Sequence, residues 1–349
     1  MRRVASIAFL MTLFITGGFI TSGNSNFTLL ANRSQRVKVT KPVPTHPGGL
    51  LADPEPQYGY SFVSNAISHA RKRVWLVMYE LSDQSVIASL EAAHRRGVDV
   101  RILLDSAYSG KSYNTEAFKE LRAAHVAVRW TPASTIVHQK TLLVDNHAWI
   151  MTGNLTPQYY SSSVDFVVSD TQPQDVREIA AAFIDDWNGD LKNTPYSTPI
   201  EGLHGDLIFS PESESTLVDL INQARPGTTL LTENEEMNSY TIQDALEAAA
   251  HRGVDVKVVM TDSYYWSQAF NQLVANGVHV STYSYYAPVY IHAKAIVINN
   301  SEVYVGSINY STASMIYNRE LGIITNNPAV VKVVENTLNT DFSNAKPWK

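Results

Sequence analysis

The segments "VHQKTLLVDN" (residues 137–146) and "IHAKAIVINN" (residues 291–300) repeat one pattern: a histidine, a lysine two residues later, and then an apolar run. In a β-strand, residues i and i+2 face the same side, so the histidine and the lysine of each copy are expected to point together. The apolar run that follows is typical of a buried strand. The two copies therefore predict two pairs of imidazole and ammonium groups, formed by His138, Lys140, His292 and Lys294.

The seventh position after each histidine differs between the copies: it is Asp145 in the first and Asn299 in the second. An odd separation places this side chain on the opposite face of a regular strand from the histidine. Asp and Asn both accept backbone hydrogen bonds in turns, and both copies must turn at this point. We therefore expect the seventh residue to fix the hairpin and not to share the His–Lys site, so that Asn299 does not abolish chemistry.

The chain also repeats on the scale of a domain. "SLEAAHRRGVDVRILLD" (89–105) matches "ALEAAAHRGVDVKVVMT" (245–261) at a constant offset of 156 residues, and each reads as a helix, a glycine stop and a strand. Alternating helices and strands on both sides of these segments predict an α/β fold. We expect two similar α/β sandwich halves, residues 51–190 and 205–349, related by a pseudo-twofold axis, with mixed or parallel sheets flanked by helices. The expected state is a monomer with one site between the halves.

The strand that returns from each motif ends in an asparagine. "MTGN" ends at Asn154 and "GSIN" ends at Asn309, with Thr152 and Ser307 two residues earlier. The asparagine lies nine residues after the seventh position in the first half and ten in the second, so the first hairpin is predicted to be one residue shorter.

An acidic residue follows each asparagine after eleven positions: Asp165 in the first half and Glu320 in the second. Both lie in apolar strands, where a carboxylate without a partner is costly. A carboxylate that holds an imidazole in one tautomer and raises its basicity would offset that cost. Glu80 and Glu236 form a further equivalent pair at predicted strand ends, from which they could reach the same pocket.

The N-terminus has the features of a secretory signal peptide. Arg2 and Arg3 precede an apolar stretch from residue 4 to 15, and small residues occupy positions 21–23. We expect a signal peptide over residues 1–23 and hence a secreted or periplasmic protein, with an uncleaved membrane anchor as the alternative. Residues 24–50 are basic and rich in proline, which predicts a tether without a core of its own.

Charge and composition restrict the partners. Subtracting the six basic residues of positions 1–50 from the formal net charge of −6 leaves −12 for residues 51–349. Proteins that grip long nucleic acids usually present a basic surface, so the acidic body argues against such a substrate. The chain has no cysteine, which excludes disulfides and thiolate metal sites.

Aromatic clusters flank the second motif, at "YYW" (264–266) and "YSYYAPVY" (283–290). Such side chains suit a lipid–water interface or a cage for a quaternary ammonium headgroup. Stacking on nucleic-acid bases and simple cover for a sheet edge are alternatives that the sequence leaves open.

The doubled pattern His-x-Lys-x4-Asp, followed by Gly-Ser-x-Asn, resembles the phospholipase D superfamily. The likeness extends over nearly the whole chain from about residue 55. The second copy departs from the pattern at Asn299, and the first has Met151 and Thr152 in place of Gly-Ser.

The resemblance implies a reaction without metal or cofactor that passes through a covalent phosphohistidine. By this analogy, His138 attacks the phosphorus, and His292 protonates the departing alcohol and then activates water. The lysines and asparagines would hold the non-bridging oxygens. The implied catalytic residues are His138, His292, Lys140, Lys294, Asn154, Asn309, Asp165 and Glu320, with Thr152 and Ser307 binding substrate.

We therefore expect a secreted phospholipase D-type phosphodiesterase that hydrolyses phospholipid to phosphatidate and an alcohol, with contact to a membrane surface. Three alternatives stay open. They are a metal-independent nuclease of the same superfamily with nucleic acid as substrate, a transferase that joins two phospholipids, and a binding module with a dead site.

Asn299→Asp restores the seventh-position acid of the second motif. Because this side chain is expected to lie away from the His–Lys pair, turnover should change by less than about tenfold, or roughly 1.4 kcal/mol of barrier. Steady-state kinetics of the variant and the parent protein test this. A gain of several orders of magnitude would show that the strand-face argument is wrong.

Overall fold

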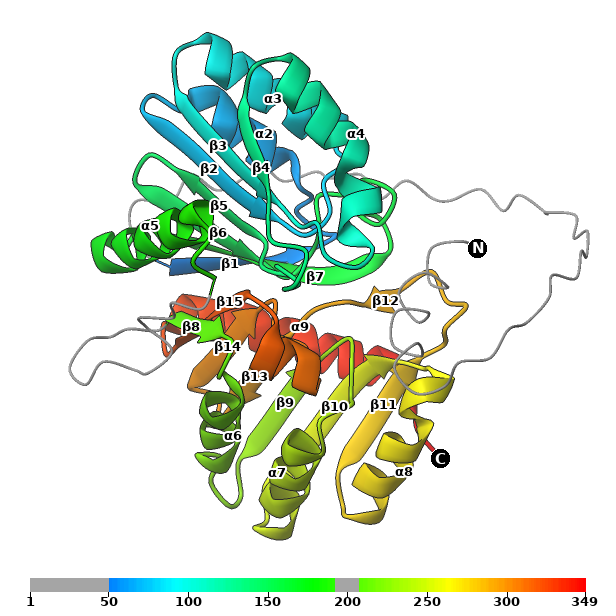
Figure 1. The fold of residues 1–349 in the computed structure, drawn as a ribbon. Helices are drawn as coiled ribbons and strands as arrows, with labels where there is room; N and C mark the ends of the chain where they lie inside the picture. Colours follow the sequence, from blue (N-terminus) through cyan, green and yellow to red (C-terminus); the bar gives the residue numbers. More distant parts are fainter. Residues whose placement is uncertain (1–49, 192–206) are drawn as a thin grey trace, which may run out of the picture. The chain divides into compact units, whose positions relative to one another are not determined.

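The computed structural model describes residues 50–191 and 207–349 (Figure 1). The predicted signal peptide (1–23) lies outside the described residues, as does the predicted tether (24–50) except for its last residue. In the two described ranges, no helix is both long enough and apolar enough to cross a membrane.

The first half contains one sheet with the strand order β1-β7-β6-β5-β2-β3-β4. The neighbours β2, β3 and β4 run parallel, and the other pairs within this order are antiparallel. In chain order the elements are β1 (Leu50–Glu55), α2 (Ser61–His69), β2 (Arg73–Met78), α3 (Gln84–Arg95), β3 (Asp99–Leu104), α4 (Gly110–Ala123), β4 (Ala127–Trp130), β5 (Thr141–Val144), β6 (His147–Met151), β7 (Ser163–Asp170) and α5 (Pro173–Asn188).

The second half has the strand order β16-β11-β10-β9-β13-β14-β15-β8, and β9, β10 and β11 are its parallel neighbours. Its elements are β8 (Leu207–Ser210), α6 (Glu214–Asn222), β9 (Thr229–Glu233), α7 (Tyr240–His251), β10 (Asp255–Thr261), the 3-10 turn η2 (Tyr264–Trp266), α8 (Ser267–Ala275), β11 (His279–Tyr283), β12 (Tyr290–Ile291), β13 (Ala295–Ile298), β14 (Glu302–Gly306), the π-turn η3 (Ala313–Tyr317), β15 (Glu320–Thr325), α9 (Pro328–Asn344) and β16 (Lys346–Pro347). Two similar α/β halves with mixed sheets confirm the predicted fold class.

Local sequence explains why the repeated segment forms the same helix and strand twice. Asp83 caps α3 by accepting the amides of the second and third residues after it, and Ser239 caps α7 through its hydroxyl. Both helices end just before a glycine with positive φ, Gly97 (86°) and Gly253 (89°). Because glycine adopts this backbone conformation without strain, the chain can turn directly into β3 and β10.

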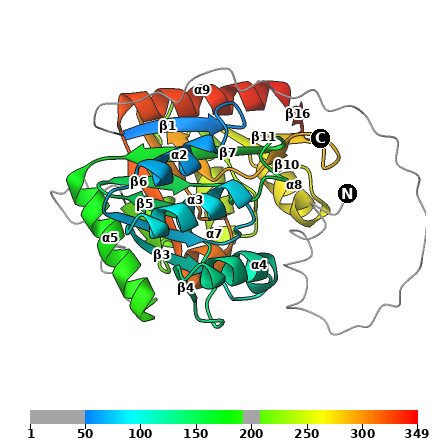
Figure 2. The same cartoon turned by 90° about the horizontal axis from the view of Figure 1, so that it is seen from above.

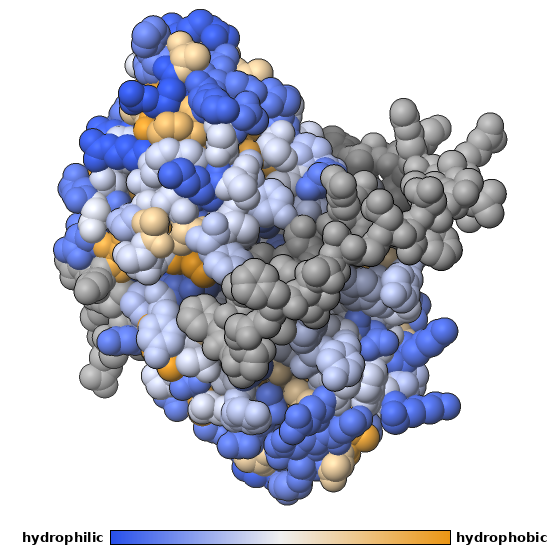
Figure 3. Space-filling model, turned by 45° about the vertical axis from the view of Figure 1, so that its right-hand side comes forward, coloured by the Kyte–Doolittle hydropathy of each residue, from blue (hydrophilic) through white to orange (hydrophobic). Residues whose placement is uncertain are grey.

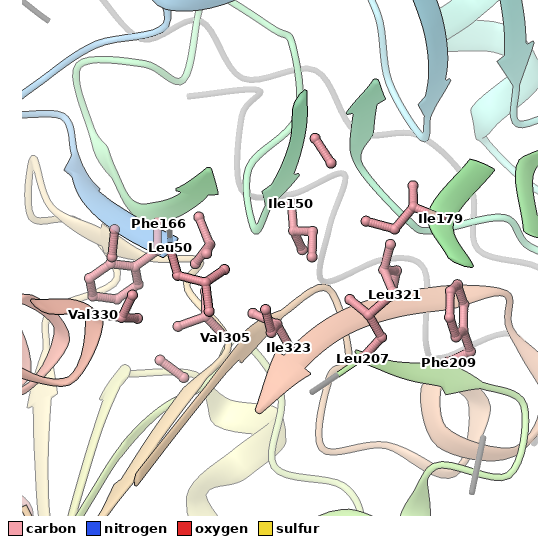
Figure 4. Close-up of a cluster of buried hydrophobic side chains, with 14 of the residues drawn as sticks. Leu50, Ile150, Phe166, Ile179, Leu207, Phe209, Val305, Leu321, Ile323 and Val330 are labelled. Atoms are coloured by element: carbon pink, nitrogen blue, oxygen red, sulfur yellow. The ribbon is translucent and has the colours of Figure 1, made fainter. Parts of the chain in front are cut away.

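Three hydrophobic clusters lie between the layers of the fold. One lies between the first sheet and helices α2, α3 and α4, and a second lies between the second sheet and α6, α7 and α8 (Figure 1). A third cluster joins the other faces of the two sheets, with Ile150 and Phe166 from the first half meeting Val305, Leu321 and Ile323 from the second (Figure 4). Helix α9 contributes Val330 to this shared core, and it runs alongside β1 (Figure 2). The halves therefore share one core and do not form separate domains.

The two seventh-position residues bind the turn that precedes a neighbouring strand. The Asp145 carboxylate accepts the backbone amides of Arg71, Lys72 and Arg73 at 2.8 to 3.0 Å, just before and at the start of β2. Asn299 Oδ1 accepts the amide of Arg225 at 2.9 Å, ahead of β9. We expected hydrogen bonds within the hairpin itself, and this detail is wrong: the Asp145 carboxylate accepts amides of the turn before β2 instead.

Burial raises the pKa of Asp145, but the three backbone amides outweigh it and the net pKa is lowered. A lowered folded-state pKa contributes stability above the usual Asp pKa, and this contribution is lost as the pH falls through the folded value.

Asp145→Ala should lower the free energy of unfolding by about 1 to 2 kcal/mol at pH 7, since the acceptor of three amides is lost at a partly exposed site. Asp145→Asn keeps one acceptor, as Asn299 does naturally, and should cost less. Urea unfolding at pH 7 and at pH 3 measures both variants, and the difference between Asp145→Ala and the parent should shrink at pH 3. Equal losses for the two variants would contradict this account.

Candidate active site

The two motifs lie at the start of equivalent strands, with their polar side chains buried. His138 and Lys140 immediately precede β5, and His292 and Lys294 stand between β12 and β13. The histidines are 8% and 6% exposed, and the lysines are almost completely buried. Side chains of this kind are buried only where they are paired or functional, so the burial itself marks the site.

Backbone hydrogen bonds attach each motif to the other half of the chain. The amides of His138 and the next residue both donate to the carbonyl oxygen of Arg319, at 2.8 and 3.1 Å. The amides of His292 and the next residue donate in the same way to the carbonyl oxygen of Val164, at 3.1 and 2.8 Å. Each acceptor directly precedes an acid, so the backbone brings the acid-bearing strand of one half beside the histidine of the other.

Each histidine is therefore paired with the carboxylate of the opposite half, so the two pairs cross between the halves. His138 Nδ1 lies 2.9 Å from Glu320 Oε2, and His292 Nδ1 lies 2.8 Å from Asp165 Oδ1. A carboxylate at Nδ1 fixes the ring and leaves Nε2 as the nitrogen that can react. The sequence predicted that these acids hold the histidines, but not that each acid serves the opposite half.

Thr152 and Ser307 lie behind the acids. The Thr152 hydroxyl donates to Asp165 Oδ1 and the Ser307 hydroxyl donates to Glu320 Oε2, each at 2.6 Å, and both residues are fully buried. The predicted role of these two residues as substrate ligands is therefore corrected: their hydroxyls orient the carboxylates that orient the histidines.

Nearby charges from both halves shift the pKa values of Lys140 and His138. Burial and, next, the nearby Lys294 lower the pKa of Lys140 to about 7. Burial also lowers the pKa of His138; Glu320 opposes this shift, and both lysines add to it. Charged groups from both halves therefore lie close enough to shift one another's pKa, and the paired lysines place positive charge beside His138.

Asn154 and Asn309 each have a buried side-chain oxygen without a hydrogen-bond partner among residues 50–191 and 207–349. The backbone amide of Asn309 is held by the Ser314 hydroxyl at 2.9 Å. A buried amide with unused hydrogen-bonding capacity is unusual in a folded protein and suits a group that binds a ligand.

Tyr79 and Glu235 are site residues that the sequence analysis missed. They are equivalent by the offset of 156, and they directly precede Glu80 and Glu236. The Tyr79 ring meets the His138 ring edge-on, with 4.7 Å between the centroids, and lies 5.1 Å from Lys140 Nζ. Glu235 instead forms an ion pair with Lys294. The constant offset could have found this pair, but their different side chains hide it from a motif search.

The described ranges contain no group of three or more His, Cys, Asp or Glu side chains arranged to hold a metal ion. The polar groups of the gap are instead two imidazoles, two ammonium groups, two amides and several carboxylates. This set can bind and polarise a phosphate ester and can move protons at two points.

The family described as "Cardiolipin synthase, PLD-like domain" matches this chain twice, over residues 63–187 and 217–342. The two matches together cover more than half of the chain, and each contains one His–Lys motif with its asparagine and acid. The protein belongs to the phospholipase D superfamily, as a chain that carries both halves of the site.

Several curated relatives have similar sequences. The probable cardiolipin synthase YwiE of Bacillus subtilis is 24% identical over 72% of this chain and 57% of its own length. Cardiolipin synthase A of Proteus mirabilis is 24% identical over 75% of this chain and 62% of its own. An uncharacterized protein of Streptococcus mutans is 23% identical, with shares of 76% and 66%. The chain thus spans less than two thirds of the length of each of these relatives.

Two solved structures share the fold. Polyphosphate kinase from Porphyromonas gingivalis matches with a TM-score of 0.64 and 15% identity, over 83% of this chain and 46% of that one. Phosphatidylserine synthase from Haemophilus influenzae matches with a TM-score of 0.64 and 12% identity, over 82% and 84% of the two chains. At such low identities these matches confirm the fold of two mixed-sheet halves.

The Lys140→Met variant tests two effects of the buried ammonium group separately: its contribution to turnover and its effect on the free energy of unfolding. A lowered pKa means that the folded protein binds this proton less tightly than the unfolded chain, so the charge costs stability below about pH 7. Turnover should fall by about 100- to 1000-fold, while the free energy of unfolding at pH 6 rises by about 1 kcal/mol, with a smaller rise at pH 9.

Kinetics and urea unfolding at the two pH values measure both effects. Lys332→Met, which removes an exposed ammonium from α9, is the matched control and should change neither quantity. A Lys140→Met protein that is less stable than the parent at pH 6 would show that the ammonium holds the fold together.

Proposed function

We propose that this protein is a phosphatidyl-transferring phosphodiesterase that moves the phosphatidyl group of a phospholipid to an alcohol through a phosphohistidine. The observation that carries the proposal is the pair of crossed histidine–carboxylate contacts around a gap with two buried lysines. The names of the relatives, cardiolipin synthases, support a phosphatidyl transfer. Hydrolysis to phosphatidate is the same chemistry with water as the acceptor.

In the first step, His138 Nε2 attacks the phosphorus and a P–N bond forms. The P–O bond to the leaving alcohol breaks, and His292 Nε2 gives its proton to that oxygen. The attacking imidazole must be neutral, and burial together with the two lysines lowers the pKa of His138 accordingly. A lowered pKa suits His138 to the role of the nucleophile.

In the second step, an incoming alcohol gives its proton to His292 Nε2 and its oxygen attacks the phosphorus, which breaks the P–N bond. Asp165 accepts from Nδ1 of His292, and Glu320 accepts from Nδ1 of His138, so both rings keep their orientation through the cycle. The two lysines and the two asparagines stabilise the charge that develops on the non-bridging oxygens.

Burial of the site favours an alcohol over water. With the histidines less than a tenth exposed, a bound lipid headgroup would close the gap to bulk solvent. Tyrosines dominate the large apolar side chains that are exposed in the described residues, and their amphipathic rings suit a lipid–water boundary. The face drawn in Figure 3 is mostly hydrophilic where residues are described, with hydrophobic residues in small scattered groups. Contact with a membrane surface would therefore rest on the exposed tyrosines.

Export of the protein is part of the proposal. Its support is the basic and apolar composition of residues 1–23, which also predicts that substrate is met outside the cytoplasm. Nucleic acid is disfavoured as a substrate by the acidic balance of residues 51–349.

The purified protein, incubated in chelator with phosphatidylglycerol vesicles, should release glycerol and form a lipid with two phosphatidyl groups. His138→Ala should abolish both products. His279→Ala, which removes an exposed histidine, is the matched control and should keep full activity. Parallel incubations with plasmid and single-stranded DNA test the nuclease alternative.

Phosphatidate as the sole product would replace transfer by hydrolysis. Cleavage of DNA alone would make the protein a nuclease, and inactivity on every substrate would favour a binding module. Each of these results would contradict phosphatidyl transfer.

A further inference from the structure

Glu235 breaks the equivalence of the two halves at the reacting histidine. Its carboxylate is buried, and Oε2 accepts from Lys294 Nζ at 3.0 Å while lying 3.4 Å from His292 Nε2. The other oxygen, Oε1, accepts from the Tyr290 hydroxyl at 3.1 Å. At the equivalent position in the first half stands Tyr79, which has no negative charge.

The Glu235 oxygen lies where a substrate oxygen must lie. Nδ1 of His292 is held by Asp165 at 2.8 Å, so Nε2 is the nitrogen that exchanges a proton with the alcohol. An alcohol oxygen at hydrogen-bond distance from Nε2 would occupy the place that Glu235 Oε2 now takes. The carboxylate must therefore move aside when substrate binds, and it then lies next to the alcohol.

The Glu235 carboxylate is ionised where it lies beside Lys294 and His292. Burial raises the pKa of Glu235, but Lys294 and His292 outweigh burial and the net pKa is lowered. To stay ionised after it has left Lys294 and His292, this buried carboxylate needs another hydrogen-bond donor. The reacting hydroxyl is already engaged by His292, and the Tyr290 hydroxyl serves Oε1.

We propose that Glu235 and Tyr290 line the subsite shared by the leaving and the entering alcohol, and that Glu235 selects alcohols with a second hydrogen-bond donor. The second donor is a hydroxyl or an ammonium group on a carbon close to the reacting hydroxyl. The inference rests on the proposed phosphatidyl transfer and names its acceptor class. Glu235 forms no covalent bond: the proton of the reacting hydroxyl goes to His292, and Glu235 only accepts a hydrogen bond from the second donor.

An alcohol without the second donor leaves a buried carboxylate without a partner. Sites built to bind a substrate hydroxyl reject analogues that lack it because the buried polar group is then unsatisfied. Glycerol and ethanolamine carry a second donor and 1-propanol does not, although the three molecules are similar in size.

The test uses a phosphatidyl ester of 4-nitrophenol as donor, with equal concentrations of glycerol, ethanolamine and 1-propanol as competing acceptors. Release of nitrophenol reports the first step, and the lipid products report how the phosphatidyl group divides among the acceptors. The parent protein should favour glycerol or ethanolamine over 1-propanol by about tenfold or more, and Glu235→Gln should remove most of that preference.

Tyr290→Phe, which removes the donor to Oε1, should shift the same ratio in the same direction by a smaller factor. This second variant still tests the proposal if the Glu235→Gln protein folds poorly. Asp244→Asn removes one exposed acid from α7 and should leave the ratio unchanged. A loss confined to ethanolamine products would identify the second donor as an ammonium group, and a loss confined to glycerol products would identify a hydroxyl.

An unchanged product ratio in both Glu235→Gln and Tyr290→Phe would overturn the inference, as would a parent protein that takes the three acceptors equally. Failure of the proposed function looks different. In that case the parent protein releases no nitrophenol, or it forms no lipid product with any acceptor.

Discussion

The site depends on the crossing of the two histidine–carboxylate pairs between the halves. Glu320 holds His138 and Asp165 holds His292, each through Nδ1 at under 3 Å. Neither half contains a complete site, because the acid that orients its histidine comes from the other half. The two halves therefore contribute to one candidate site, and the shared hydrophobic core between the sheets keeps the halves in register.

A second interaction reinforces the crossing on the side of His138. The Arg319 carbonyl accepts two amides of the first motif, and its buried guanidinium contacts Asp186 of α5 at 3.0 Å. Gln139, next to His138, donates to the same Asp186 carboxylate at 2.8 Å. Gln139 and Arg319, the neighbours of His138 and Glu320, therefore both bind the Asp186 carboxylate. A buried ion pair is weak evidence for stability, but it can specify one arrangement, and here it fixes the position of His138 relative to the carboxylate that orients it.

Much of this arrangement follows from the sequence. Strand periodicity places each histidine beside its lysine, and the constant offset of 156 predicts two similar halves. The cost of burying Asp165 and Glu320 predicts that they hold the imidazoles. Which acid serves which histidine depends on contacts between residues more than 120 positions apart, and periodicity carries no information on such contacts.

Other misses have the same physical origin. Thr152 and Ser307 follow the motif pattern of substrate ligands, yet tertiary packing turns their hydroxyls to the acids. Glu235 belongs to no sequence motif, and only its contacts with Lys294 and His292 identify it as a site residue. The two halves differ at the equivalent positions Tyr79 and Glu235, which contact the two motifs.

Trapping of the covalent intermediate tests the central claim most directly. A phosphatidyl ester with a good leaving group needs no acid for the first step, so His292→Asn should accumulate the phosphatidyl adduct. Mass spectrometry of the alkaline digest should find one adduct per chain, on the peptide that carries His138, and none in His138→Asn. An adduct on His292 in the His138→Asn protein, or no adduct in either variant, would contradict a single shared site in which His138 attacks and His292 transfers the proton.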